Sequence, residues 1–397
     1  MSDETILRIA AKGDGVTASG AHHAGAVTGD IVNSDGSFTR GKHYQEPPCK
    51  HFTQCGGCSL QYADEKVLSQ FALERVLYAA EGKGVEAKEL LPTHLSPPKS
   101  RRRATLHAVK RGKNAQIGFR QAGSHKIVDL TECHILVPEL FALAKPLRTF
   151  IAKHGGKAPI DIDLTLTDQG ADVSIKQIEL DGLEATEAAL EFAQANSLAR
   201  LSLDMGYGAE PIWEPEPVTI TLANTPVAYP SGAFLQATRD AEALMMADAA
   251  EMLSGAGKVV DLFAGLGTFA FALSKQSQLT AVEAARDAHL ACRAAASRAQ
   301  LPVEAMHRDL FRNPLQDDEL KHFDAALLDP PRAGARDQIA AIAASGLQRV
   351  CYISCNPASW SRDAKQLVEA GFTLQKLRPI GQFRWTTHVE LVSYFTR

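Results

Sequence analysis

From Gly232 onward the sequence alternates apolar, strand-like runs with stretches of helical periodicity, and this alternation restricts the fold more than any other feature of the chain. Strands that alternate with helices form parallel sheets covered by helices on both faces. We therefore predict an α/β, Rossmann-like, doubly wound domain that binds its ligands beyond the carboxyl ends of the strands. The four predicted strands are residues 258–263, 279–283, 323–329 and 350–354.

The length of the chain, 397 residues, exceeds what one hydrophobic core usually supports, so two or three domains are expected. Short glycine-rich pieces in residues 1–45 predict a small N-terminal β-barrel. Residues 46–225 contain a cysteine-rich loop, a helix over residues 66–80 that can pack on the C-terminal domain, and several strands, which predict a β-rich central domain. The α/β domain takes residues 226–397.

The composition is that of an ordinary globular protein, with 45% hydrophobic and 22% charged residues. No run approaches the roughly 20 apolar residues that a membrane-spanning helix needs. The first residues lack the charged and apolar regions of a secretory signal, so we expect a cytoplasmic protein. In that compartment the seven cysteines are expected to bind metal or to act in catalysis rather than to form disulfides.

A glycine-rich loop follows the first strand of the C-terminal domain, with Asp261, Gly265 and Gly267 in the pattern D-x-x-x-G-x-G. The loop lacks the third glycine of a dinucleotide-binding loop and the lysine of a P-loop, which disfavours both ligands. Its pattern is typical of S-adenosylmethionine-dependent methyltransferases, which hold a single nucleoside. The sequence therefore favours S-adenosylmethionine as the cosubstrate.

Acidic residues follow the strands beyond this loop. Glu283 ends the next strand, where an acid typically binds ribose hydroxyls. Asp309 is expected near the adenine, and Asp329 begins an Asp-Pro-Pro sequence at the carboxyl edge of the sheet. An aromatic residue after Asp-Pro-Pro would suggest methylation of an exocyclic amine, whereas this chain has Arg332. The pattern favours methylation at carbon.

Cys355 ends a predicted strand at Asn356-Pro357, which exposes the strand end. Carbon 5 of uracil becomes nucleophilic only after a thiolate has added to carbon 6, and a general base must then remove the carbon-5 proton. Cys355 is the predicted nucleophile. Glu390 is the predicted base, since a glutamate among apolar residues is costly to bury without a role. Cys351 and Cys292 are expected to pack as small apolar residues.

Four cysteines outside this domain predict a metal centre. Cys49, Cys55 and Cys58 lie within ten residues and surround two glycines, and Cys133 is a distant fourth. Four thiolates suit either zinc or an iron-sulfur cluster. The five-residue spacing between the first two cysteines modestly favours iron-sulfur, with zinc as the alternative.

The densest basic run is Arg101-Arg102-Arg103, continued downstream by Arg120, in a chain whose net charge is -4. A charge run is most often a solvated face. Phosphate contacts nevertheless demand local Lys and Arg, so these four arginines are the predicted RNA contacts.

Together these motifs resemble the bacterial RNA uracil-5-methyltransferase family, and more closely its iron-sulfur-containing 23S rRNA branch, across most of the chain. Residues 354–357 and 388–390 resemble the nucleophile and base motifs, and residues 327–334 and 234–236 resemble two cosubstrate motifs. The resemblance implies Cys355 as nucleophile and Glu390 as base. It also implies an S-adenosylmethionine site formed by Gln236, Phe263, Gly265, Gly267, Thr268, Glu283, Asp309 and Asp329, and a 4Fe-4S cluster held by Cys49, Cys55, Cys58 and Cys133.

By the same resemblance residues 1–45 look like a shortened TRAM domain, and the target base is flipped into a pocket between the β-rich domain and the parallel sheet. We expect a monomer that acts on a uridine of 23S rRNA. The same chemistry on a tRNA uridine is an alternative, although the tRNA branch usually lacks the barrel and the cluster. A non-catalytic RNA-binding or ribosome-assembly factor is the alternative of a different class.

Overall fold

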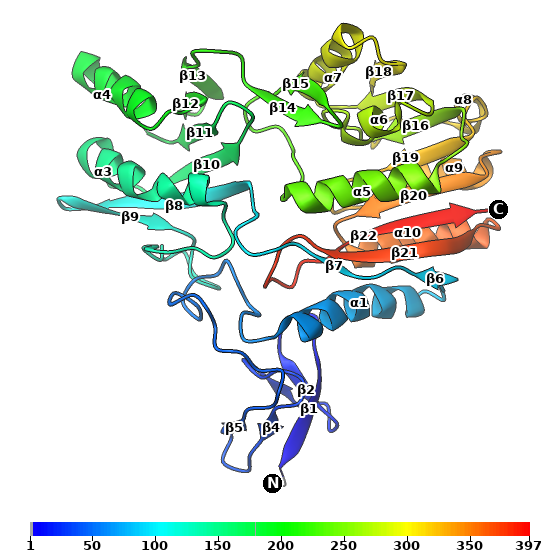
Figure 1. The fold of residues 1–397 in the computed structure, drawn as a ribbon, viewed down its shortest axis with the longest axis horizontal. Coiled ribbons are helices and arrows are strands. Elements are labelled where there is room, and N and C mark those ends of the chain that lie inside the picture. Colours follow the sequence, from blue (N-terminus) through cyan, green and yellow to red (C-terminus); the bar gives the residue numbers. More distant parts are fainter. Residues whose placement is uncertain (1–2, 179) are drawn as a thin grey trace.

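The computed structural model describes residues 3–178 and 180–397. Two lobes lie side by side, a central lobe drawn mainly in cyan and green and a C-terminal lobe drawn mainly in yellow to red, with a small N-terminal sheet below them (Figure 1). No helix in these two ranges has the length and the apolar character needed to cross a membrane.

The N-terminal sheet is antiparallel and has the order β3-β2-β1-β4-β5. Ile6, Ala26 and Val32 form its own small core, and the buried carboxylate of Asp30 pairs with Arg40 at 2.6 Å. The small, shortened barrel that was expected takes the form of this curled antiparallel half-barrel. Its strands are β1 (Glu4–Ile9), β2 (Gly15–Thr17), β3 (His22–His23), β4 (Ile31–Val32) and β5 (Phe38–Thr39).

The central lobe is a six-stranded sheet of order β13-β12-β11-β10-β8-β9, as expected for a β-rich domain. The strands are β8 (Arg103–Arg111), β9 (Asn114–Gly118), β10 (Ile160–Leu166), β11 (Ala171–Lys176), β12 (Arg200–Asp204) and β13 (Ala209–Trp213). Three helices pack against this sheet: α2 (Pro138–Ala142), α3 (Ala144–His154) and α4 (Gly182–Ala195).

The C-terminal lobe confirms the predicted doubly wound sheet, with the order β18-β17-β16-β19-β20-β22-β21. Its first five strands are parallel, and β22 runs antiparallel to β20 and β21. The central strands are buried along almost their whole length because helices cover both faces. The strands are β16 (Lys258–Leu262), β17 (Gln278–Glu283), β18 (Val303–His307), β19 (Ala325–Leu328), β20 (Arg349–Ser354), β21 (Thr373–Gly381) and β22 (Glu390–Thr396).

Two groups of helices cover this sheet. One face packs against α5 (Arg239–Met252), α6 (Thr268–Leu273) and α7 (Arg286–Arg298). The other packs against α9 (Arg336–Ala344) and α10 (Pro357–Glu369), with the short α8 (Asp317–Leu320) beside α9. This three-layer arrangement leaves the carboxyl ends of the parallel strands free to form a site.

Segments that precede the central lobe in sequence also belong to the C-terminal lobe. Helix α1 (Glu65–Glu81) packs against α10 and β21, and the short strands β6 (Glu89–Leu90) and β7 (His94–Leu95) pair with β21. The hairpin of β14 (Thr219–Leu222) and β15 (Thr225–Ala228) packs against α7, so the expected boundary at residue 225 falls inside it. The central lobe is therefore inserted into a C-terminal lobe that begins before it.

Candidate active site

The strand order of the C-terminal sheet reverses at β16, which has β17 on one side and β19 on the other. Loops beyond the carboxyl ends of parallel strands meet at such a point, and a cavity of about 400 Å³ lies there. Because β22 is antiparallel, its first residue lies at the same edge. Nine of the ten predicted catalytic and cosubstrate residues line the cavity: Gln236, Phe263, Gly265, Thr268, Glu283, Asp309, Asp329, Cys355 and Glu390.

The tenth, Gly267, shapes the loop without lining the cavity. Its φ of +90° lies in the left-handed region, and an added Cβ would meet Cys292 Sγ and a Phe271 ring carbon, each at 2.8 Å. Only glycine fits there. Cys292 is buried and packs under the loop, as expected for a thiol without a chemical role.

The acidic residues of the rim are held by backbone groups. Glu283 accepts hydrogen bonds from the N–H groups of Gly265 at 2.8 Å and Ala285 at 2.6 Å. Asp309 accepts one from the N–H of Phe311 at 3.0 Å. Carboxylate oxygens have further lone pairs, so each acid can also accept a hydroxyl or amine of a ligand.

The register of β20 and β22 brings the predicted nucleophile and base together. Ser354 pairs with Leu391, and the residues next to this pair are Cys355 and Glu390. Burial, together with the charges of Glu390 and Asp329, raises the pKa of Cys355 to about 11. Burial and the charge of Asp329 raise the pKa of Glu390 to about 8. Both groups therefore hold their protons more tightly than in water, and each must lose its proton before it acts.

A buried amide, Gln382, links this pair to the cosubstrate side of the cavity. Its Nε2 donates to Glu390 Oε2 and, at 3.0 Å, to Gln236 Oε1. Its Oε1 accepts from the N–H of Ala237 at 3.0 Å, which fixes the amide orientation. Gln236 in turn donates from Nε2 to Asp329 at 3.0 Å. Gln382 carries no recognisable motif in the sequence, because its contacts join three distant segments that meet only in the fold.

Arg332 and Asn356 join the two loops that flank Cys355, the predicted nucleophile. Asn356 donates from Nδ2 to the Arg332 carbonyl at 2.9 Å, while its Oδ1 caps α10 by accepting from the N–H of Ala358. The Arg332 side chain lines the cavity, and its charge opposes the rise in the pKa of Cys355. The Asp-Pro-Pro-Arg sequence thus places a cation beside the thiol, a function that the sequence did not reveal.

A second, smaller cavity brings the four predicted metal-binding cysteines together. It is lined by Cys49, Cys55, Cys58 and Cys133 and by apolar side chains such as Phe52, Phe119 and Leu130. The Gly57 N–H donates to Cys55 Sγ at 3.4 Å. An added Cβ on Gly56 would lie 2.7 Å from the Arg120 carbonyl, so the glycine lets the loop pack against that backbone.

The four cysteines line one cavity without forming disulfides. In the described part of the chain, no three His, Cys, Asp or Glu side chains converge closely enough to hold a single metal ion. The four cysteines are free of disulfides, and most of the cavity wall is apolar. Four free thiols on one mostly apolar cavity wall are a donor set that either an iron-sulfur cluster or a zinc ion can use.

Arg102 does not face solvent, so the prediction that it contacts RNA is wrong. Its side chain is 2% exposed, and its Nη2 lies 2.5 Å from Glu242 Oε2 on α5. Its Nε also donates to the Gln236 carbonyl at 3.1 Å. A buried arginine needs such partners, and this one joins the start of β8 to the C-terminal lobe.

The other three predicted arginines are more accessible. Arg103 lies over the ring of Phe234, 4.6 Å from its centroid, at the mouth of the cavity. Arg101 lies over Phe383 at 5.4 Å. Arg120 is 3.7 Å from Asp161 in a partly exposed ion pair. Their positions are compatible with RNA contacts, which stay a prediction.

Comparisons with known proteins agree with this geometry. The profile of the family described as tRNA (uracil-5-)-methyltransferase matches residues 218–397. An RNA methyltransferase of Zymomonas mobilis is 47% identical over 99% of both chains. The 23S rRNA (uracil(1939)-C(5))-methyltransferase RlmD of Vibrio vulnificus is 29% identical over 94% of this chain and 89% of its own.

A crystal structure with a similar fold is known. The crystal structure of Pyrococcus abyssi tRNA (uracil-54, C5)-methyltransferase in complex with S-adenosyl-L-homocysteine covers 99% of both chains with a TM-score of 0.78 and 20% identity. Two findings assign the protein to a family. The Zymomonas relative is similar over nearly the whole chain, and the family profile matches the lobe that carries Cys355 and Glu390. The protein is an enzyme that belongs to the RNA (uracil-5-)-methyltransferase family.

Proposed function

We propose that this enzyme methylates carbon 5 of a uridine in 23S rRNA, with S-adenosylmethionine as the methyl donor. The observation that carries the proposal is the meeting of Cys355 and Glu390 at one edge of a cavity whose other wall is the glycine-rich loop. A nucleophilic thiol and a base on the same side of a nucleoside-sized cavity suit addition to a flipped pyrimidine.

The chain's own groups perform two of the chemical steps. The thiolate of Cys355 bonds to carbon 6 of the uracil, and the electron pair of the 5,6 double bond moves toward carbon 5 and oxygen 4. S-adenosylmethionine, when bound, supplies the methyl group that carbon 5 takes. Glu390 then removes the remaining proton from carbon 5, and the electron pair re-forms the double bond as the Cys355 sulfur leaves.

Some cavity residues are placed to bind S-adenosylmethionine, and others line the side where the uridine would lie. Glu283 is placed to accept ribose hydroxyls and Asp309 to accept from the adenine, since both line the rim with lone pairs to spare. Phe263 and Phe311, whose ring centroids are 5.3 Å apart, offer apolar surface beside them. Gln236 and Asp329 complete the wall toward the nucleophile.

Two observations favour 23S rRNA over tRNA as the substrate. The relative named for a 23S rRNA uracil is similar over 94% of this chain, and the four-cysteine cavity matches the iron-sulfur branch suggested by the sequence. We therefore propose a 4Fe-4S cluster held by Cys49, Cys55, Cys58 and Cys133. The five-residue spacing between Cys49 and Cys55 modestly favours the cluster over zinc. Methylation of a tRNA uridine remains the second candidate, since it would use the same active site.

The decisive experiment traps the covalent step. RNA carrying 5-fluorouridine cannot lose fluorine from carbon 5, so the enzyme should stay bound to it and migrate slowly in a denaturing gel. Cys355→Ala should trap none, whereas Cys351→Ala, which removes a buried thiol from the same strand, should trap like wild type. Equal trapping by Cys355→Ala would refute the mechanism.

The base and the substrate need separate tests. Glu390→Gln should form adduct with unmodified RNA and release it slowly, because the carbon-5 proton has no acceptor; normal turnover would assign the base elsewhere. Mass mapping of rRNA and tRNA from a strain lacking the gene identifies the substrate. Loss of a methyl group from tRNA alone would overturn the choice of 23S rRNA.

A further inference from the structure

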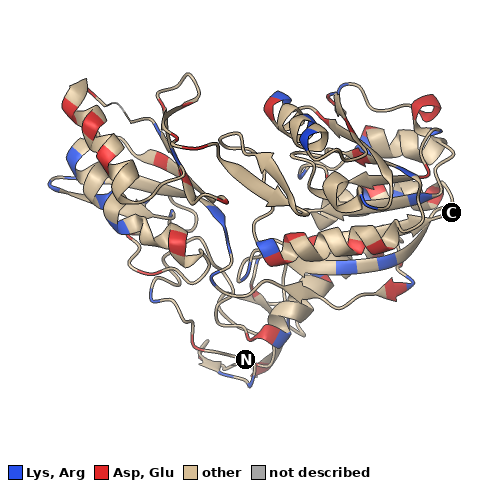
Figure 2. Cartoon of the chain, turned by 45° about the horizontal axis from the view of Figure 1, so that its top comes forward, with Lys and Arg blue, Asp and Glu red and all other residues tan. Residues whose placement is uncertain are grey.

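Positive charge is concentrated in one segment of the central lobe. Residues 99–157 contain thirteen Lys and Arg and only three Asp and Glu, in a chain whose net charge is -4. In Figure 2 blue (Lys and Arg) segments of the ribbon lie along the strands and α3 of this lobe, and red (Asp and Glu) segments lie on α4. The remainder of the chain is correspondingly acidic, so this segment is where an anionic macromolecule would be attracted.

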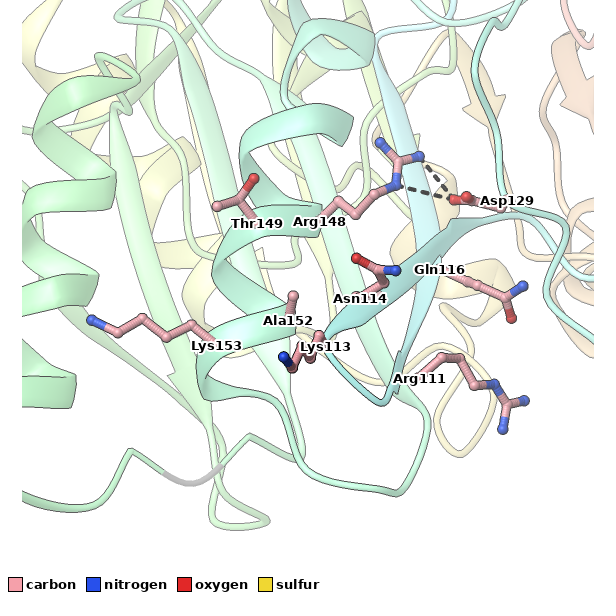
Figure 3. A pocket seen from close by; sticks show the side chains of 10 residues that line it. Arg111, Lys113, Asn114, Gln116, Asp129, Arg148, Thr149, Ala152 and Lys153 are labelled. Carbon is pink, nitrogen blue, oxygen red and sulfur yellow. Dashed lines mark hydrogen bonds and ion pairs between the residues drawn. The ribbon is translucent and has the colours of Figure 1, made fainter.

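Part of this charge lines an open pocket of about 700 Å³ between the tip of the β8–β9 hairpin and α3, which we call the hairpin pocket (Figure 3). Arg111 and Lys113 come from the hairpin, and Arg148 comes from α3. Asn114 and Gln116 add neutral hydrogen-bonding groups from β9. The pocket lies away from the catalytic cavity, and no residue lines both.

The guanidinium of Arg148 is held in place. It donates from Nε and Nη2 to Asp129 Oδ1, at 3.2 and 2.8 Å, and from Nη2 to the Leu130 carbonyl at 2.8 Å. Figure 3 shows Arg148 and Asp129 turned toward each other above Asn114. These bonds leave Nη1 as the edge of the guanidinium that can bind a ligand. A pre-positioned arginine loses less side-chain entropy on binding an anion than a free one.

The charge of the pocket is not cancelled by its one acid. Asp129 neutralises one cation, while Arg111 and Lys113 are exposed at the hairpin tip. In Figure 3, Lys113 lies beside Ala152 of α3 and Arg111 extends away from that helix. Lys153 instead extends away from the pocket and lies 3.6 Å from Glu184 on α4. The acidic α4 therefore borders the basic surface on one side and would repel a polyanion there.

We propose that the hairpin pocket binds the phosphate backbone of the substrate RNA, on a segment that flanks the target uridine. This inference rests on the proposed function, because it takes RNA as the substrate. Exposed cations with amide groups between them suit backbone phosphates and carry no base code, so the contact orients the RNA without specifying sequence.

Strand β8 sets the distance between the two sites. Arg103 begins β8 at the mouth of the catalytic cavity, and Arg111 ends it at the hairpin pocket. Eight steps along a strand span about 26 Å. A stacked nucleic-acid strand advances about 3.4 Å per nucleotide, so the bound phosphates lie on the order of eight nucleotides from the target uridine.

The test compares a double variant, Arg111→Gln with Lys113→Gln, with a matched control, Lys275→Gln with Lys321→Gln. The control removes the same charge from exposed positions of the C-terminal lobe. Binding of a 23S rRNA transcript is measured against salt concentration. Loss of two phosphate contacts should reduce the logarithmic salt slope by about 1.4 to 1.8, and the control should leave it unchanged. Arg111→Lys should restore part of the slope, since it keeps the charge.

Methylation of nested RNA fragments around the mapped uridine tests the distance. On long fragments the double variant should raise KM and leave kcat unchanged; on fragments that end within about six nucleotides of the uridine it should match wild type. An equal loss on the shortest fragments, or an equal change of slope in the control, would overturn the proposal. Failure of wild type to methylate any fragment would refute the proposed function instead, while the salt slopes would still report on the pocket.

Discussion

The side-chain amide of Gln382 donates a hydrogen bond to the carboxylate of Glu390 where both side chains are at least 95% buried. A hydrogen bond to the charged form of an acid lowers its pKa, and here it opposes the effect of burial. Because Gln382 also donates to Gln236, the proposed base and the proposed cosubstrate wall share one donor group. Gln382 is thus a positioning residue that keeps Glu390 ionisable.

Replacing Gln382 should shift the pH dependence of turnover. In Gln382→Met the pKa of Glu390 rises further above its value of about 8, so single-turnover methylation should fall most at pH 7 and recover toward pH 9. Gln375→Met, on the strand β21 that ends just before Gln382 but bonded to Thr396, is the control and should keep the wild-type profile. A loss of the same factor at every pH would show that Gln382 serves the fold rather than the base.

Glu390 should reduce the stability of the fold as the pH rises. Its pKa is raised from 4.5 to about 8 in the folded protein, so between these values the folded state holds a proton that the unfolded state has lost. Its favourable contribution is complete below pH 4.5 and is lost as the pH rises through 8. Glu390→Gln should therefore gain more in Tm over wild type at pH 8 than at pH 5. A constant difference between the two pH values would contradict the raised pKa.

The meeting of the candidate catalytic residues in one cavity could largely be predicted because it follows from parallel topology. Asp329 and Cys355 each follow an apolar strand, and the carboxyl ends of parallel strands share one edge. Glu390 belongs to an antiparallel strand, so the parallel topology did not predict its position; its apolar sequence context and its motif marked it. The fold explains it afterwards, since its register with β20 brings it beside Cys355.

Other features could not be predicted because they depend on contacts between distant segments. The pairing of Glu89 with Lys376 joins strands nearly 290 residues apart, and nothing local specifies it. Arg102 looked like part of a solvated run, yet the direction of its side chain at the start of β8 turns it to Glu242. Its neighbours Arg101 and Arg103 do not share that partner, which follows from the alternation of side chains along an extended chain.

The Arg102–Glu242 ion pair should stabilise the contact between the central and C-terminal lobes. Removing one partner of a buried ion pair leaves the other charge unpaired, so Arg102→Met should lower the free energy of unfolding by about 3 to 5 kcal/mol. The double variant with Glu242→Leu should lose less, because neither charge is then buried alone. Arg120→Met, in an exposed pair, should cost about 1 kcal/mol or less. Equal losses for the Arg102 and Arg120 variants, measured by urea unfolding, would contradict this role.

The four-cysteine cavity makes a spectroscopic prediction. Protein purified without oxygen should be brown and show a broad absorbance band at the blue end of the visible range, whereas a zinc site would be colourless. Cys133→Ala should lose the band and lower Tm, because a group bound only by the folded state stabilises it. Cys292→Ala should keep the band, since that thiol packs under the glycine-rich loop. Colourless wild-type protein with one equivalent of zinc would reject the cluster.

The pKa of Cys355 predicts how covalent addition depends on pH. The thiol has a pKa of about 11 in the free protein, so the thiolate fraction should rise about tenfold for each pH unit between 7 and 9. The rate of adduct formation with 5-fluorouridine RNA should rise with it. Arg332→Gln should slow trapping at pH 7.5, because the positive charge of Arg332 favours the thiolate, and the exposed Arg336→Gln is the control. A trapping rate that stays constant from pH 6.5 to 9 would mean that the thiol is already ionised when RNA binds, and that Arg332 acts on the substrate rather than on the nucleophile.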